Sequence, residues 1–231
     1  MADIALVNHA GFHQPHREEL ERDALLVAPS LLGGLLSVCL DGASVTVRIT
    51  EVEAYHGLGT GSTPDPGSHA RMGKTGRNAT MWGAPGHLYV YLSHGIHSCV
   101  NVACSPDGVA SGVLLRAGEV IEGVDAAAAR RTTSREFVDL ARGPGRLGKA
   151  VGLVPSLHNG IDALAGGAAQ AGALARLWFR DQPLVDVAAG PRVGVSGRAG
   201  TDAFPWRFWI PGDPTVSPFR PGRGAVGAAE A

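Results

Sequence analysis

The strongest structural signal in this chain is a long β-hairpin. Residues 35–40 and 45–55 are both rich in apolar and β-branched side chains, and the pair Asp41-Gly42 lies between them. An Asp-Gly pair supplies the positive φ that tight turns require, so the two runs predict antiparallel strands joined by a short turn. The second strand is therefore expected to be long and paired.

Shorter signals lie on both sides of the hairpin. A helical pattern covers residues 17–33, although Pro29 must kink or end it. We expect further strands at residues 87–92, 98–103 and 112–117, a helix over 125–141, and short strands within 184–217. A chain of 231 residues fits one domain. The pattern therefore predicts a single globular unit, residues 1–231, with a β-rich core and flanking helices.

Three segments resist assignment to helix or strand. Residues 56–84 are rich in Gly, Ser, Thr and Pro, and a loop of that length usually serves function or is disordered. The Ala/Gly-rich stretch at about 160–175 is expected to be a flexible surface excursion. Residues from about 220 to 231 are expected to form a C-terminal tail.

Composition narrows the class of protein. Charged residues make up 18% of the chain, and no apolar run approaches the roughly 20 residues of a membrane helix. No basic-then-apolar leader stands at the N-terminus. The three cysteines, Cys39, Cys99 and Cys104, include no CxxC pair, which favours buried, reduced thiols. We expect a cytoplasmic protein with no membrane partner.

The overall charge gives no support for a nucleic-acid partner, because the net charge is −1. The distribution is more informative. Residues 71–149 hold ten Lys or Arg against six Asp or Glu, and this local excess is compatible with phosphate contacts.

A carboxylate and an aromatic ring stand two residues apart in the long strand, at Glu53 and Tyr55. Strand side chains alternate between the two faces of a sheet, so both project from one face. This pair is a candidate reaction centre. The alternative is that Glu51, Glu53 and Tyr55 lie on a solvated face, as an arbitrary glutamate usually does.

Other polar and aromatic residues can converge on the same cleft. Tyr89 and Tyr91 repeat the spacing of two with two rings, and Asn101, Arg116 and the loop residue His69 can join them. One acid, several rings and a few polar groups suit a pocket for a flat heteroaromatic ligand.

Two further acid or metal arrangements are weaker. Glu51 and Glu53 resemble the acid pair of a glycosidase, but such pairs normally flank the substrate from different elements. His94, His97 and Cys99 lie close in sequence, yet no HExxH or CxxC spacing is present, so we predict no metal site.

Residues 143–148 match the GxGxxG pattern letter for letter. The dinucleotide fingerprint needs a strand before it, whereas a helix is expected here, so we predict no nucleotide cofactor. A Gly-rich turn at a helix N-terminus can still hold one phosphate through backbone N–H groups.

Several short motifs follow one another in a defined order. They are Glu53-Ala54-Tyr55, Asp65-Pro66-Gly67-Ser68-His69-Ala70, Arg77-Asn78, Pro85-Gly86-His87-Leu88-Tyr89-Val90-Tyr91, Asn101, Val113-Leu114-Leu115-Arg116-Ala117, Gly143-Pro144-Gly145-Arg146-Leu147, Pro191-Arg192-Val193-Gly194-Val195 and Pro205-Trp206-Arg207-Phe208. In this order they resemble the alkyladenine (3-methyladenine) DNA glycosylase family over most of the chain.

The resemblance implies a fold and an activity. The fold is α+β, one compact domain around a curved, open-barrel-like antiparallel sheet with flanking helices. The activity is excision of alkylated or deaminated purines, such as 3-methyladenine, 7-methylguanine and hypoxanthine, from double-stranded DNA by base flipping in base excision repair. It implies a monomer without cofactor or obligatory protein partner, acting at the bacterial nucleoid.

The resemblance also assigns roles to single residues. Glu53 is the expected general base, Asn101 stands where the family blocks the 2-amino group of guanine, and Arg116 supports the base or the backbone near Glu53. The expected lining of the pocket is Tyr55, His69, Tyr91 and Leu114. The expected DNA contacts are His94, Arg71, Lys74, Arg77, Gly145 and Arg146.

One departure from the family pattern concerns the DNA gap. The family usually places an intercalating tyrosine where this chain has His94, in Leu92-Ser93-His94-Gly95. Imidazole is smaller, and stacking of a base on an aromatic ring contributes roughly 1 to 3 kcal/mol. We therefore expect His94 to stabilise the gap that the flipped nucleotide leaves in the duplex less than a tyrosine would. The loop between Tyr55 and His69 also looks longer than in the family.

The chain has two lysines, Lys74 and Lys149, which leaves few candidates for a Schiff base. We therefore expect a monofunctional glycosylase without strand cleavage. Two other classes remain as hypotheses: a DNA damage-binding protein without efficient catalysis, and a metal hydrolase built on His94, His97 and Cys99.

Overall fold

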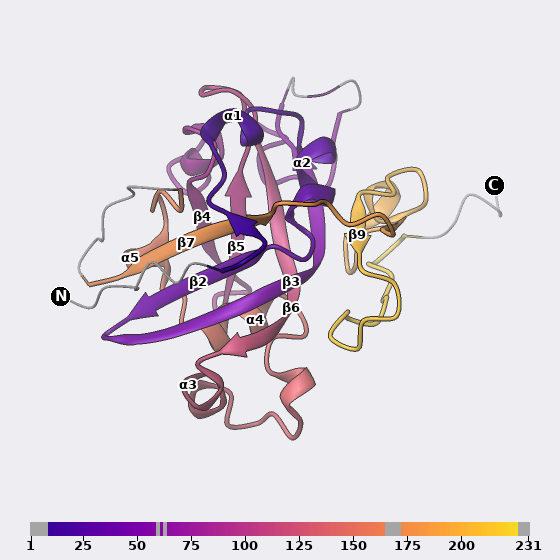
Figure 1. The fold of residues 1–231 in the computed structure, drawn as a ribbon. Coiled ribbons are helices and arrows are strands. Elements are labelled where there is room, and N and C mark those ends of the chain that lie inside the picture. The colour runs from indigo at the N-terminus through magenta and orange to yellow at the C-terminus, as the bar shows by residue number, and fades with distance from the viewer. Residues whose placement is uncertain (1–8, 59–60, 62–63, 165–171, 226–231) are drawn as a thin grey trace.

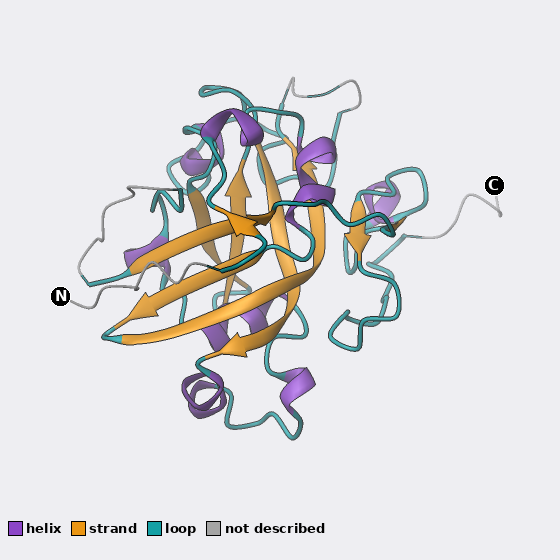
Figure 2. Ribbon diagram, viewed as in Figure 1, coloured by secondary structure: helices purple, strands orange, loops and turns teal. Residues whose placement is uncertain are grey.

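One large antiparallel sheet organises the molecule (Figures 1 and 2). The structure is a computed structural model that describes residues 9–58, 61, 64–164 and 172–225. Along the sheet the strands follow the order β1-β7-β2-β3-β6-β5-β4, while β9 pairs with both β3 and β8. Their bounds are β1 Phe12–His13, β2 Leu35–Leu40, β3 Ala43–His56, β4 Leu88–Ser93, β5 His97–Ala103, β6 Ser111–Glu122, β7 Leu174–Arg180, β8 Ala188–Gly190 and β9 Arg207–Trp209.

Short helices flank this sheet (Figure 2). They are α1 Arg17–Leu20, α2 Ala24–Leu31, α3 Val124–Arg130, α4 Pro144–Val151 and α5 Pro155–His158, with 3-10 turns η1 Ala79–Trp82, η2 Phe137–Asp139 and η3 Gly197–Gly200. The sheet curves but does not close into a barrel. The predicted α+β class, single compact domain and open antiparallel sheet are confirmed. Among the described residues, no helix is long and apolar enough to cross a membrane.

Strand β3 is the central strand of the sheet and pairs with β2, β6 and β9. The predicted hairpin is present, with β2 and β3 joined at Asp41 and Gly42, whose φ angles are 51° and 79°. Strand β6 pairs along nearly the whole of β3, and the register shifts on either side of Glu51. Such irregularities bend a strand. On its other side, β3 passes from β2 to β9, so both edges stay paired around Glu53.

The N-terminal helical region differs from the prediction. Instead of one helix over 17–33 broken at Pro29, two helices form, and the break lies at residues 21–23. Asp23 begins the second helix because its carboxylate accepts a hydrogen bond from the Leu25 N–H at 2.8 Å. Pro29 is accommodated near the end of α2, close to where the helix stops at Leu31.

The helix predicted over 125–141 is also shorter than expected. It ends at Arg130, and a turn leads into η2. Thr132 and Thr133 are β-branched, and the Ser134 hydroxyl hydrogen-bonds the Glu136 carbonyl, so this stretch favours a turn over a helix. The resulting segment, residues 131–143, lies beside the N-terminus of α4.

The Ala/Gly-rich segment is not a simple excursion. Ile161, Ala163 and Ala175 are buried in the core, and β7 begins at Leu174 and pairs with β2. Residues 165–171 of the predicted excursion lie outside the described residues. The start of the expected tail is anchored too, because the Gly194 and Gly197 N–H groups donate to the Arg220 and Arg223 carbonyls; residues 226–231 are not described.

Candidate active site

The Glu53 side chain is fully buried in the middle of β3, and three donors surround its carboxylate. The Tyr55 hydroxyl donates to Oε2 at 2.8 Å, and the Val193 backbone N–H donates to Oε1 at 2.7 Å. Arg116 on β6 places Nη1 3.5 Å from Oε1. The alternative of a solvated face is therefore wrong for this glutamate. A carboxylate has about four acceptor positions. With three donors in place, Glu53 can still accept a hydrogen bond from a ligand.

The neighbouring carboxylate, Glu51, is also fully buried but is committed to structural bonds. It accepts from Arg207 Nε at 2.6 Å and from the Ser217 N–H at 2.9 Å and hydroxyl at 3.0 Å, and it lies 3.0 Å from Arg116 Nε. Glu51 does not line the cavity that Glu53 lines. The glycosidase-like acid pair is therefore not formed, because one member is a counterion for two arginines.

Aromatic rings wall the cavity next to Glu53. The Tyr89 and Tyr91 rings stack with centroids 5.2 Å apart and an interplanar angle of 22°. The His69 ring meets Tyr91 edge to face at 4.7 Å. The cavity has a volume of about 540 Å³. We call it the tyrosine cavity.

Most of the predicted site residues meet there. The lining includes Glu53, Tyr55, His69, Tyr91, Asn101, Leu114 and Arg116, together with two expected DNA contacts, Arg71 and His94. Lys74 and Arg77 lie outside it, exposed in the loop of residues 56–84. Arg77 stacks over the Tyr91 ring at 5.9 Å and donates to the Leu92 carbonyl. Gly145 and Arg146 line an adjoining cavity instead.

The Tyr55 phenol is poised as a hydrogen-bond donor. Burial and the nearby Glu53 carboxylate raise its pKa well above the ordinary value. The hydroxyl therefore keeps its proton at neutral pH and directs it to Glu53. The Arg192 guanidinium carbon lies over the Tyr55 ring, 4.5 Å from its centroid.

A buried ion pair fixes the two segments that bring Gly67 and Val193 to the cavity lining, and no local sequence pattern indicated its role. Arg192 is fully buried and donates to both oxygens of Asp65 at 2.8 and 2.7 Å. Asp65 also accepts from the N–H groups of His56 and Gly67. The partners are 127 residues apart in sequence. This pair anchors the loop that carries His69 and sets the backbone beside Val193, whose N–H holds Glu53.

The turn between β4 and β5 carries His94. His94 has a φ of 51° and Gly95 a φ of 72°, so the tip of this hairpin is a tight left-handed turn. The His94 side chain is exposed and its Nδ1 lies 3.1 Å from the Ser93 hydroxyl. His94 is one of the residues that line the tyrosine cavity, and its entry into DNA stays a prediction.

The arrangement expected for a metal hydrolase does not assemble in the described part of the chain, where no three His, Cys, Asp or Glu side chains gather as ligands. Cys99 instead lines the tyrosine cavity, and burial raises the pKa of its thiol to about 11. All three cysteines are buried and free, as expected. The GxGxxG residues begin helix α4 at Gly143, and the segment before them runs through η2.

Known proteins are similar in sequence to this chain over most of its length. The sequence model of a family described as "Methylpurine-DNA glycosylase (MPG)" matches residues 18–214. A relative from Nocardia farcinica is 47% identical over 92% of this chain and 94% of its own length. Relatives from Streptomyces avermitilis and Mycobacterium tuberculosis are 48% and 43% identical, over 88% and 90% of this chain and 91% and 98% of their own. Each of the three is named "Putative 3-methyladenine DNA glycosylase".

The geometry around His69 predicts its charge state. Desolvation lowers the pKa of His69 from its ordinary value of 6.5, and the positive charges of Arg77 and Arg71 lower it further. The imidazole should therefore be neutral at pH 7, and its folded-state midpoint should lie below 6.5. An NMR titration of the His69 ring measures this. Arg77→Gln should shift the midpoint upward, whereas a wild-type midpoint at or above the ordinary value contradicts the account.

Proposed function

Because the chain belongs to the methylpurine-DNA glycosylase family, we propose that it excises alkylated or deaminated purines from double-stranded DNA. The expected substrates are 3-methyladenine, 7-methylguanine and hypoxanthine. The observation that carries the proposal is one buried carboxylate, Glu53, at a cavity walled by Tyr55, Tyr91 and His69. A base inside a duplex cannot reach such a carboxylate, so the nucleotide must first be flipped out.

In this proposal Glu53 acts as the general base. A water on the far side of the sugar gives a proton to the carboxylate while its oxygen bonds to C1′. The bond from C1′ to the purine nitrogen breaks, and its electron pair leaves with the base. Glu53 also stabilises the positive charge that develops on the sugar. The bonds from Tyr55 and Val193 hold the carboxylate in one orientation, which favours this step.

The rings give a reason for selectivity. A purine alkylated at N3 or N7 carries a positive charge, which weakens its glycosidic bond. Aromatic faces attract a cation by roughly 0.5 to 2 kcal/mol each. A neutral His69 packed on Tyr91 adds a ring without adding positive charge. The Asn101 amide donates to the Tyr89 carbonyl at 3.3 Å, which holds this side chain at the cavity wall. In this position Asn101 would exclude guanine by blocking its 2-amino group.

Strand cleavage is not expected. Lys74 and Lys149 are both exposed, and neither lines the tyrosine cavity. A lysine that forms a Schiff base with the abasic sugar would have to reach that cavity. The products are therefore a free base and an intact abasic strand. Arg71, Lys74 and Arg77 lie in residues 66–81, a segment that supplies part of the cavity lining, where they can meet phosphates.

The first test uses duplex DNA with one hypoxanthine or one 7-methylguanine, followed by alkali, which cuts at abasic sites. The wild-type protein should give a cut band, and Glu53→Gln should lower the rate about a hundredfold or more. Glu119→Gln, a change at a half-exposed carboxylate on β6, is the matched control and should cut at the wild-type rate. Without alkali, no cut band should appear, and borohydride should trap no covalent adduct.

Two outcomes contradict the proposal in different ways. Tight binding of damaged duplex by wild-type protein without any cut band would indicate a damage-binding protein instead. Normal cutting by Glu53→Gln would leave the glycosylase activity intact but remove the general-base role.

A second test concerns the residue that holds the DNA gap. Imidazole stacks less than a phenol, so His94→Tyr should tighten binding to damaged duplex, by up to about tenfold for 1.4 kcal/mol of added stacking. Affinity for a duplex with an abasic-site analogue measures this. His94→Ala should weaken the same affinity. If neither change alters binding or turnover, His94 does not occupy the gap.

A further inference from the structure

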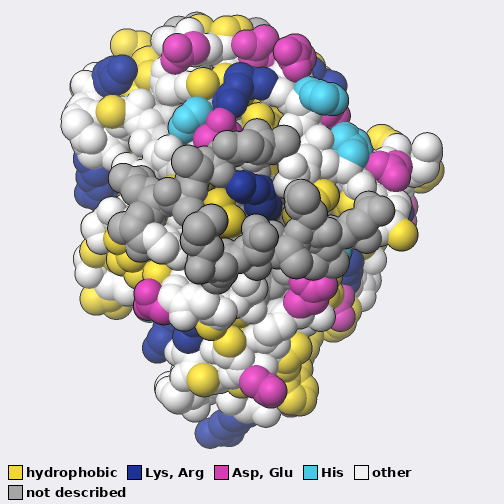
Figure 3. Space-filling model, turned by 60° about the vertical axis from the view of Figure 1, so that its left-hand side comes forward, with side chains coloured by type: hydrophobic (Ala, Val, Ile, Leu, Met, Phe, Trp, Pro, Cys, Tyr) yellow, Lys and Arg dark blue, Asp and Glu magenta, His cyan; other side chains and the backbone are white. Residues whose placement is uncertain are grey.

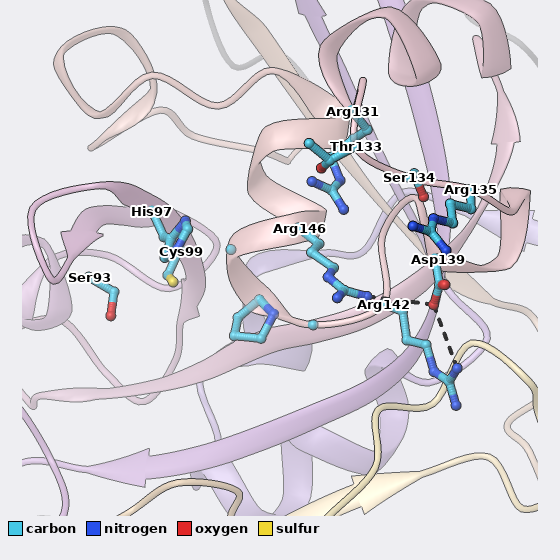
Figure 4. Close-up of a pocket in the computed structure, with 13 residues that line it drawn as sticks. Ser93, His97, Cys99, Arg131, Thr133, Ser134, Arg135, Asp139, Arg142 and Arg146 are labelled. Atoms are coloured by element: carbon cyan, nitrogen blue, oxygen red, sulfur yellow. Dashed lines mark ion pairs between the residues drawn. The ribbon is translucent and has the colours of Figure 1, made fainter.

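A segment near the C-terminus, residues 215–225, is tied to the sheet at its start (Figure 1, yellow). The hydroxyl groups of Thr215 and Thr50 share a hydrogen bond of 2.8 Å, and Thr50 belongs to β3. The Val216 carbonyl accepts from Arg142 Nε at 3.0 Å, and Arg142 lines the adjoining cavity drawn in Figure 4. The match to the family model ends at residue 214, so these contacts lie beyond it. We call residues 215–225 the C-terminal segment.

Every polar group of Ser217 is bonded to the buried charges around Glu51. Its N–H donates to Glu51 Oε2 at 2.9 Å, and its hydroxyl donates to Oε1 at 3.0 Å. The hydroxyl oxygen accepts from Arg116 Nε at 3.2 Å, and the Ser217 carbonyl accepts from Arg207 at 2.8 Å. Only 7% of Ser217 is exposed, so water cannot readily replace these bonds. Ser217 thereby fixes the Arg116 guanidinium, whose Nη1 lies 3.5 Å from Glu53 Oε1.

The second half of the C-terminal segment pairs with the loop after β8, which lines the tyrosine cavity. The Gly194 N–H donates to the Arg220 carbonyl at 2.8 Å, and the Gly197 N–H donates to the Arg223 carbonyl at 3.0 Å. Val193 directly precedes Gly194. These two backbone bonds therefore limit how far the Val193 N–H can move.

The two chains come so close here that only glycine fits. A Cβ atom placed on Gly222 would lie 2.1 Å from the Val195 carbonyl oxygen, and one placed on Gly200 would lie 1.9 Å from it. Both separations are far shorter than a van der Waals contact. Neither glycine has a φ in the left-handed region, so the space, rather than the backbone conformation, excludes a side chain. A methyl group at position 222 would push the Val195 backbone away.

We propose that the C-terminal segment positions the Glu53 carboxylate for base release. It holds both groups that contact Oε1, because Ser217 fixes Arg116 and the backbone bonds after Val193 fix the Val193 N–H. Tyr55 reaches the other oxygen, Oε2, from β3 itself. The inference rests on the proposed function for the step that Glu53 performs, whereas the positioning is a property of the folded chain.

The first measurement needs no DNA. Amide hydrogen exchange followed by NMR should show the Val193 N–H protected in the wild-type protein, because it is bonded to Glu53. Gly222→Ala places a methyl group against the Val195 carbonyl, so exchange at Val193 should become about tenfold faster or more. Amide groups of β2 should exchange at the wild-type rate, which shows that the change is local.

Gly76→Ala is the matched control for this exchange measurement. It adds the same methyl group at an exposed glycine whose φ is not left-handed, and a Cβ atom there meets nothing within 4 Å. Exchange at Val193 should therefore stay at the wild-type rate.

The second measurement is the single-turnover rate of base release at saturating protein, which reports the chemical step rather than binding. Ser217→Ala removes only the hydroxyl that joins Arg116 to Glu51, so this rate should fall about tenfold. Affinity for the damaged duplex should stay at the wild-type value. In a Glu53→Gln background the same change should have no further effect on the rate, because Ser217 acts through that carboxylate.

Glu119→Gln is again the control for the rate of base release and should leave it unchanged. Figure 3 shows positive and negative side chains interspersed on the described part of one face of the molecule. The loss of one exposed charge from a mixed surface changes stability little, so this control separates a general effect of charge from a positioning effect.

Wild-type exchange at Val193 in Gly222→Ala would overturn the proposal, and so would an equal increase in Gly76→Ala. A loss of rate in Ser217→Ala that persists in full in the Glu53→Gln background would also overturn it, since the residue would then act only on the fold. If Gly222→Ala lacks a cooperative melting transition, Ser217→Ala decides, because it adds no atoms.

The exchange measurement also separates this inference from the proposed function. A wild-type protein that releases no base, but whose Val193 exchange responds to Gly222→Ala as expected, would contradict the proposed function. The positioning of Glu53 by the C-terminal segment would then still stand.

Discussion

Arg116 stands between two buried carboxylates, and the candidate site depends on that arrangement. Glu51 and Glu53 are both fully buried on β3, and buried negative charges are costly unless positive groups pair with them. Arg116 contacts both, and Arg207 adds a second positive charge to Glu51. Removing one partner of a buried ion pair typically costs about 3 to 5 kcal/mol. The Glu51 carboxylate is occupied by bonds within the fold, whereas the Glu53 carboxylate has fewer partners and can accept a further hydrogen bond.

The rest of the frame fixes where that carboxylate points. Strand β3 is paired on both edges at Glu53, by β6 and by β9, so the backbone there has little freedom. The buried pair of Arg192 and Asp65 then brings two distant segments together. One segment supplies the Val193 N–H that holds Glu53, and the other carries His69 to the ring wall. A segment rich in Gly, Ser and Pro can thus line a cavity because Asp65 is tied to the buried Arg192.

Patterns local in sequence were predictable, and contacts between distant segments were not. The period of two in β3 placed Glu53 and Tyr55 on one face, and the Asp-Gly turn set the hairpin. The residue pattern also pointed to Tyr91, Asn101, Arg116 and His69, and the resemblance to a family added Leu114, Arg71 and His94 to the residues that line the cavity. Local composition misled at β7, where Ala and Gly next to Leu174 concealed a core strand, and at residues 131–141, where threonines end a helix. Glu51 pairs with Arg207, and Asp65 pairs with Arg192, and in both pairs the partners lie more than 100 residues apart in sequence. No local pattern carries that information.

In the proposed complex, Glu53 faces the sugar of a purine that is held between the rings of the tyrosine cavity. A crystal structure of Glu53→Gln bound to duplex DNA with one hypoxanthine tests it most directly. We expect the base to stack between Tyr55 and Tyr91, with a water on the far side of C1′ within about 2.6 to 3.2 Å of the side chain at position 53. A base seated outside the tyrosine cavity, or a C1′ turned away from position 53, would contradict it.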